Sequence, residues 1–140
     1  MENAFVHRRL VQFADTDLAG IVHFARYALY MEEAEHAFLR GRGLSVHQPR
    51  PDGLLCWPRV HASCDFRSPA RFEQTLDIAV TVELSEKSAT YRFEMSVAGQ
   101  AVASGKIVAA CCRQDAATGV LRAVPIPADW RTKLGIVSAG

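Results

Sequence analysis

At 140 residues the chain is long enough for one domain, residues 1–140, to bury a core without disulfide or metal staples. Its formal net charge of +1 provides no bulk attraction to nucleic acid or to an anionic membrane surface. Residues 1–11 carry charges with no apolar run behind them, and no later run approaches the ~20 apolar residues of a membrane span. We therefore expect a cytoplasmic protein that binds neither nucleic acid nor membrane.

The first strong pattern along the chain is a helical stripe that follows Ala19–Gly20. Apolar residues recur every three or four positions, at Phe24, Tyr27, Met31, Ala34 and Phe38. A helix end is predicted at Gly41 or Gly43, because glycine commonly ends helices and cations are favoured nearby. Much of the remaining circumference is also apolar, which indicates a helix wrapped by other structure.

Strand patterns occupy most of the rest of the chain. Residues 5–13 form a weak first strand, residues 45–53 a loop, and residues 56–66 a second strand. Alternation is clearer in 76–82 and 91–97, and a tight turn at 98–100 predicts a hairpin with 101–113. Pro127 opens a short terminal helix. One long helix followed by antiparallel strands predicts an α+β fold with the helix on a single sheet.

The four cysteines are Cys56, Cys64, Cys111 and Cys112. They form no CxxC pair, and no histidine stands near them at ligand spacing. We therefore expect small, reduced, buried thiols and no metal site.

Two aspartates, Asp15 and Asp17, stand directly before the predicted helix. One interpretation is turn formation and helix capping, which aspartates commonly provide. The other is chemistry, because free N–H groups of the first helical turn, around His23 and Phe24, can stabilise a developing oxyanion. Gly20 would let a ligand approach closely, and a carboxylate there could act as nucleophile or general base.

The stretch F-x-D-x-D-x-x-G-I-V-x-F-x-x-Y, from Phe13 to Tyr27, resembles the signature of the 4-hydroxybenzoyl-CoA thioesterase family. Weaker similarity continues through residues 68–71, Lys87–Ser88 and residues 121–130. The resemblance implies a hotdog fold, an antiparallel sheet wrapped around one central helix. It also implies acyl-CoA thioesterase activity, as in the Tol-Pal-associated members of that family.

The same resemblance assigns roles in the opening stretch. It places the catalytic carboxylate at Asp17 and the backbone N–H that polarises the thioester carbonyl at Phe24, beyond Gly20. Asp15 then supports the loop. The family mechanism is attack by the carboxylate or its activation of water, and the sequence leaves both open.

Substrate contacts are also carried over from the family. Glu32 stands where a helix carboxylate is associated with the acyl pocket; its alternative is a partly buried acid satisfied by a hydroxyl or an arginine. His23 is interpreted as a pocket-lining or surface residue rather than a base. Tyr27, with Tyr30 and Trp57, lines either the acyl pocket or the core.

Lys87, Ser88 and Arg122 match positions that contact coenzyme A phosphates or pantetheine, which suits charge-assisted bonds. Taken singly, each is equally well a solvated surface residue. Coenzyme A is part of the substrate, so no cofactor is expected. Because active sites of this fold lie between subunits, a homodimer is expected, and a tetramer of two dimers.

Two other functional classes remain open. A hotdog hydratase pairs Asp with His at five positions apart, whereas Asp17 and His23 are six apart. A binding module would hold acyl-CoA without cleaving it. The acyl group is also open, between 4-hydroxybenzoyl, 1,4-dihydroxy-2-naphthoyl and a short aliphatic chain.

Overall fold

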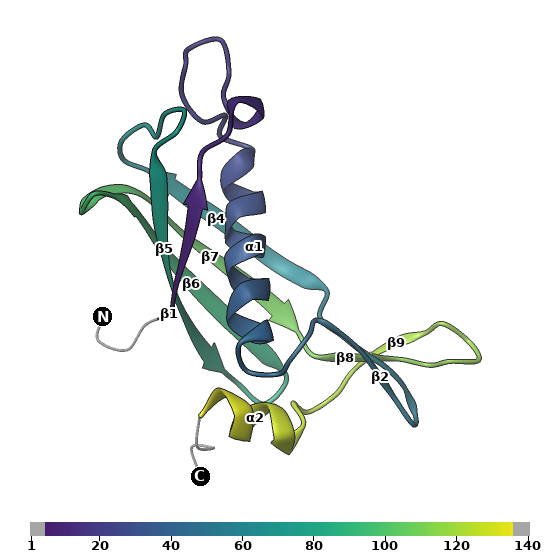
Figure 1. Cartoon of the computed structure of the whole chain (residues 1–140). Coiled ribbons are helices and arrows are strands. Elements are labelled where there is room, and N and C mark those ends of the chain that lie inside the picture. Colours follow the sequence, from purple (N-terminus) through teal and green to yellow (C-terminus); the bar gives the residue numbers. More distant parts are fainter. Residues whose placement is uncertain (1–4, 136–140) are drawn as a thin grey trace.

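In the computed structural model, which describes residues 5–135, a long helix lies across one face of a five-stranded antiparallel sheet (Figure 1). The strands are β1 (Phe5–Leu10), β4 (Arg59–Phe66), β5 (Thr75–Leu84), β6 (Ser88–Val97) and β7 (Gln100–Ala110). Their spatial order is β1-β5-β6-β7-β4, so β1 and β4 are the edges. The predicted α+β class is thereby confirmed.

Alternation along the central strands explains which face is buried. Leu76, Ile78 and Val80 on β5 are buried, and the register places Ile78 opposite Met95 and Val80 opposite Phe93. Because side chains alternate across a strand, these residues all face the helix and form the core beneath it.

The helix, α1, spans Arg26–Arg40 and buries one face against that core. The helix ends at Gly41, its C-cap residue, as the sequence predicts. The predicted start is wrong by about half a turn, because Phe24 lies before the helix and its side chain is 68% exposed. Tyr27, Met31 and Phe38 do belong to the buried face.

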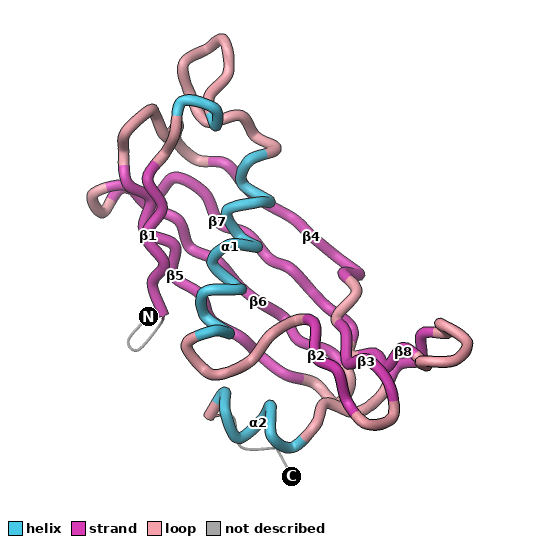
Figure 2. Tube along the Cα trace, turned by 45° about the vertical axis from the view of Figure 1, so that its right-hand side comes forward, coloured by secondary structure: helices cyan, strands magenta, loops and turns pink. Residues whose placement is uncertain are grey.

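A second, four-stranded sheet projects beyond the C-terminal end of α1 (Figure 2). It contains β2 (His47–Arg50), β3 (Gly53–Cys56), β8 (Cys112–Gln114) and β9 (Leu121–Ala123), in the order β2-β3-β8-β9. The helix lies on one sheet as predicted, but this second sheet was not predicted, and the predicted loop over 45–53 is wrong. Pro49 suggested a loop, but it lies in the edge strand β2, where a missing N–H is tolerated.

Two predicted strands divide where the chain passes between the sheets. Residues 56–66 split at Trp57–Pro58, and residues 101–113 split at Cys111. The terminal helix α2 (Ala128–Leu134) follows Pro127 as predicted, and its Trp130 packs on Trp57 with ring centroids 4.6 Å apart. The buried Trp130 thus joins the second sheet to the core.

One ion pair crosses from the helix to the edge strand β4. The Glu35 side chain is 0% exposed, and its carboxylate accepts two hydrogen bonds from Arg59, one of them 2.9 Å from Nη1 to Oε2. Burial raises the pKa of the Glu35 carboxyl, although the Arg59 guanidinium opposes that rise. A bidentate contact of this kind fixes β4 against α1.

The four cysteines are free thiols; Cys111 and Cys112 are buried, and the other two half-buried. Neither α1 nor α2, the α-helices of residues 5–135, is long and apolar enough to cross a membrane.

Candidate active site

The segment between β1 and α1 forms a small hairpin that presents Asp17. It follows a 3-10 turn, η1 (Phe13–Asp15), and Thr16 bridges Val22 in antiparallel fashion. The Asp17 N–H donates to the Ile21 carbonyl at 3.0 Å, and the Gly20 N–H donates to the Asp17 carbonyl at 2.9 Å. Gly20 adopts a φ of +79°, which only glycine tolerates easily. The turn therefore favours glycine at this position.

The two aspartates face different environments. Asp15 is 3% exposed, and its Oδ2 accepts the Gln12 N–H at 2.9 Å. Asp17 is exposed; its Oδ1 accepts the Ala19 N–H at 2.9 Å, and no hydrogen bond to its Oδ2 is found within residues 5–135. Asp15 is therefore part of the folded framework, while Asp17 keeps a carboxylate oxygen available.

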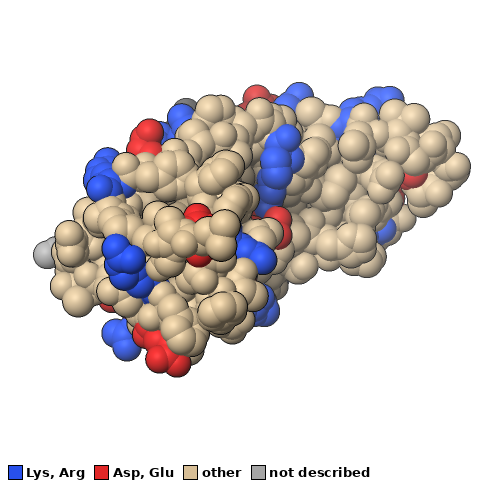
Figure 3. Space-filling view, turned by 90° about the horizontal axis from the view of Figure 1, so that it is seen from above, with Lys and Arg blue, Asp and Glu red and all other residues tan. Residues whose placement is uncertain are grey.

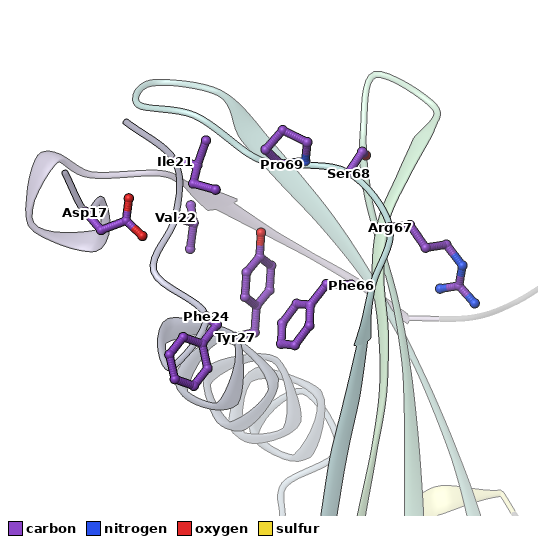
Figure 4. Close-up of a pocket in the computed structure, with 9 residues that line it drawn as sticks. All are labelled: Asp17, Ile21, Val22, Phe24, Tyr27, Phe66, Arg67, Ser68 and Pro69. Carbon is purple, nitrogen blue, oxygen red and sulfur yellow. The ribbon is translucent and has the colours of Figure 1, made fainter. Parts of the chain in front are cut away.

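A cavity of about 470 Å³ opens beside Asp17 (Figure 4). Its lining residues are Asp17, Ile21, Val22, Phe24, Tyr27, Phe66, Arg67, Ser68 and Pro69. The Tyr27 and Phe66 rings meet edge to face, with centroids 5.2 Å apart, between the helix and the end of β4. In Figure 4 the Arg67 side chain points away from Asp17, so the walls nearest the carboxylate are apolar.

The backbone N–H of Phe24 is available for a ligand. The neighbouring amides are used: His23 N–H donates to the Asp15 carbonyl at 2.9 Å, and Ala25 N–H to His23 Nδ1 at 3.1 Å. Within the described part of the chain, the Phe24 N–H has no acceptor. It lies two residues before α1, where free amides and the helix dipole favour negative charge.

His23 lies outside the cavity lining, with its ring exposed and stacked on Phe24 at 4.7 Å. Since Nδ1 accepts the Ala25 N–H, the neutral ring carries its proton on Nε2. No hydrogen bond joins His23 to Asp17 in residues 5–135. The Asp–His pair that a hydratase requires is thus not formed here.

Tyr27 is the lining residue whose acidity is most altered. Burial raises the pKa of its hydroxyl, so the phenol stays protonated and keeps a hydrogen-bond donor near the cavity. Within residues 5–135, no three or more His, Cys, Asp or Glu side chains gather as a metal site would require.

Four of the residues carried over from the family lie elsewhere. Glu32 is exposed on α1 and does not line the cavity, and the helix acids that an arginine satisfies are Glu33 and Glu35 instead. Lys87 and Ser88 stand at the turn between β5 and β6, at the opposite end of the sheet from Asp17 (Figure 1). Arg122 lies on β9 in the projecting sheet.

The pairing of β4 and β6 with β7 gives the distance between the Asp17 end of the sheet and the Lys87–Ser88 end. Phe66, beside the cavity, pairs with Ala103, whereas Ser88 pairs with Ala110. The steps from 103 to 110, at about 3.3 Å each, separate the two ends by roughly 23 Å. A single chain therefore does not gather Lys87 and Ser88 with Asp17.

Four lining residues outside the opening stretch had no predicted role: Phe66, Arg67, Ser68 and Pro69. Phe66 closes a strand, where alternation alone cannot separate a pocket residue from a core residue. The family resemblance over residues 68–71 was the signal for Ser68 and Pro69, and no pattern singled out Arg67.

Charges are interspersed on the face seen from the Asp17 end, with single Lys and Arg side chains between acidic ones (Figure 3). This face therefore offers no continuous basic patch to a polyanion.

The long helix on an antiparallel sheet places the chain in the class of hotdog-fold thioesterases. The solved structure of a 4-hydroxybenzoyl CoA thioesterase mutant shares this fold, with a TM-score of 0.80 and 22% identity over 94% of this chain and 98% of that one. The chain belongs to the Thioesterase-like superfamily, whose sequence profile matches residues 11–134. It is a thioester hydrolase.

Two relatives are similar over nearly their whole length. The 1,4-dihydroxy-2-naphthoyl-CoA hydrolase of Synechocystis sp. is 28% identical over 133 residues, covering 93% of this chain and 94% of that protein. The structure of a gentisyl-coenzyme A thioesterase is 29% identical with a TM-score of 0.75, covering 91% of this chain and 99% of that one. The predicted family is thereby confirmed.

Proposed function

We propose that the protein hydrolyses the thioester of an aryl- or short- to medium-chain acyl-CoA, releasing the carboxylic acid and coenzyme A. The observation that carries the proposal is that Asp17 and Phe24, whose N–H has no acceptor within residues 5–135, line the same apolar cavity. The reaction needs a nucleophile or base and an oxyanion donor at one carbonyl, and these two groups supply them. Coenzyme A enters as part of the substrate, so no separate cofactor takes part.

Asp17 has two routes to the same products. In one, its carboxylate attacks the thioester carbon, expels the coenzyme A thiolate and forms an acyl anhydride that water cleaves. In the other, it removes a proton from water, which attacks in its place. In both, the Phe24 N–H stabilises the oxyanion, and removal of one such donor typically costs about 10²–10³-fold in rate. Transfer of ¹⁸O from water into the Asp17 carboxyl during turnover selects the first route.

An aromatic acyl group is the best fit to the cavity walls. Phe24, Tyr27 and Phe66 offer ring faces and edges, and about 470 Å³ accommodates a one- or two-ring acid. Both relatives described above are named for aryl-CoA substrates. The protonated Tyr27 hydroxyl can donate to a ring substituent or the acyl oxygen.

Binding of the coenzyme A part of the substrate requires a second copy of the chain. β4 pairs with β7 on one side and leaves its other edge free, with Val60 and Phe66 exposed. Two β4 edges related by a two-fold axis pair antiparallel. That pairing sets the Lys87–Ser88 end of one copy beside the Asp17 end of the other. A homodimer would then complete the nucleotide site, and sedimentation velocity tests it and the further pairing into a tetramer.

The deciding experiment is thiol release from a panel of aryl- and alkyl-CoA esters by wild type and Asp17→Asn. We expect the variant to lose at least ~100-fold in kcat. Asp77→Asn, at a half-buried aspartate on β5 that does not line the cavity, is the matched control and should keep wild-type rates. Equal rates for Asp17→Asn and wild type would contradict the site assignment.

The same preparations test the other two classes. Tight acyl-CoA binding without cleavage of any ester would favour a binding module. Hydration of a crotonyl-type ester would favour a hydratase.

A further inference from the structure

We infer that Arg9, itself held by Glu33, is a positioning residue that fixes the Asp17 hairpin by clamping Asp15. The inference rests on the proposed function, because the clamp matters to turnover only if Asp17 does the chemistry. No pattern in the sequence singled out Arg9 or Glu33.

Arg9 projects from β1 toward the helix and is engaged on three sides. Its Nε donates to Glu33 Oε1 at 2.8 Å, and its Nη1 lies 3.3 Å from Asp15 Oδ2. Its guanidinium also stands 5.0 Å from the centroid of the Tyr30 ring. The side chain is only 18% exposed, so these contacts are shielded from solvent more than a surface pair would be. Arg9 therefore ties β1, α1 and the loop together.

Asp15 connects Arg9 to both ends of the Asp17 hairpin. Its carboxylate accepts the Gln12 N–H before the hairpin, and its carbonyl accepts the His23 N–H after it. The hairpin between these points is short and is closed by the Thr16–Val22 bridge. A shift of Asp15 consequently moves Asp17 and the Phe24 amide relative to each other.

Loss of Arg9 would leave the Asp15 carboxylate without its closest cation. The remaining cation, Arg26, lies 3.9 Å away and is 40% exposed. A buried carboxylate with one amide donor is unfavourable, so Asp15 would turn outward. That change loosens the hairpin.

A looser hairpin should slow the chemical step rather than weaken substrate binding. A misplacement of about 1 Å at a reacting group can cost about 10²-fold in rate. The cavity that binds the acyl group is built mainly from other side chains, such as Phe66 and Pro69, which the clamp does not touch. We therefore expect kcat to fall while KM changes little.

Arg8 supplies a matched control one residue away. It points to the other face of the sheet, is 78% exposed, and lies 3.4 Å from Asp77. Arg8→Met removes the same charge from the same strand without touching the clamp. Differences between the Arg8 and Arg9 variants therefore report the clamp and not the net charge.

The test compares Arg9→Met, Arg9→Lys and Arg8→Met by steady-state kinetics and by amide hydrogen exchange over residues 12–23. For Arg9→Met we expect a 10- to 100-fold lower kcat, a KM within about 3-fold of wild type, and faster exchange of the His23 amide. Arg9→Lys should recover part of both, and Arg8→Met should match wild type. The inference is overturned if Arg9→Met matches Arg8→Met in kcat and in exchange.

Two further variants complete the test. Glu33→Gln weakens the hold on Arg9 without removing it and should shift kcat and exchange in the same direction, so a wild-type result for it contradicts the role of Glu33. If Asp17→Asn retains full turnover, the catalytic role proposed for Asp17 fails by itself. The exchange rates over residues 12–23 then still decide whether Arg9 holds the hairpin.

Discussion

Replacement of Arg59 by methionine should destabilise the fold far more than an ordinary surface substitution. Arg59 is 29% exposed, but its partner Glu35 is 0% exposed, so the variant leaves a carboxylate buried with no counter-ion. Breaking a buried pair in this way typically costs about 3–5 kcal/mol. Because Arg59 is partly solvated, we expect the lower end, about 3 kcal/mol, out of a typical total of about 5–15 kcal/mol.

The loss should depend on pH in a defined direction. Burial raises the pKa of the Glu35 carboxyl above its unfolded value, so the folded state binds the proton more tightly. Stability from such a group is fully present below the unfolded pKa and is lost as pH rises through the folded pKa. Without Arg59 the folded pKa rises further. The deficit of Arg59→Met should therefore be small in acid and largest at neutral to alkaline pH.

Urea unfolding followed by the fluorescence of the buried Trp57 and Trp130 measures these differences. All midpoints are compared at one protein concentration, because self-association would add stability by mass action. Arg8→Met, which breaks an exposed pair, should cost under ~1 kcal/mol. The double variant Glu35→Met/Arg59→Met should regain most of the loss. A cost for Arg59→Met no larger than that of Arg8→Met would refute the reasoning.

Three further predictions concern packing and thiol chemistry. Gly105→Ala should cost about 1–3 kcal/mol in urea unfolding, because a Cβ there collides with the Met31 sulfur; an unchanged midpoint would show that Met31 moves aside freely. Trp130→Phe removes the 2.9 Å bond from Nε1 to Gln48 Oε1 and should lower Tm, by an amount equivalent to about 1–3 kcal/mol. Burial raises the pKa of the Cys111 thiol to about 12, so native protein and Cys111→Ala should release equal amounts of chromophore with a disulfide reagent at pH 8.

The sequence was most informative where local pattern and burial agree. Period-two alternation located β5 and β6, and the three-to-four spacing located α1. Both patterns are clear because one continuous core fixes which side of each element is buried. The second sheet escaped prediction. Its strands are three or four residues long, too short for a pattern, and the Pro49 signal favoured a loop.

Of the candidate site, the sequence predicted the loop that carries Asp17 and Phe24. The family resemblance located Asp17 and Phe24, and the structure brings both to one cavity. It could not indicate that the buried helix acid is Glu35 rather than Glu32, since the two differ by less than one helical turn. Lys87, Ser88 and Arg122 do not line that cavity, and their substrate contacts stay predictions.

The position of β1 in the sheet has a consequence for how the site is made. Tight turns join β5 to β6 and β6 to β7, whereas β1 pairs Phe5 with Val80, far along the chain. Loop-closure entropy makes such distant pairing a late event in folding. During synthesis β1 cannot dock until β5 has left the ribosome. The segment that bears Asp17 follows β1 directly, so this loop, although made early, is among the last parts of the chain to reach its final place.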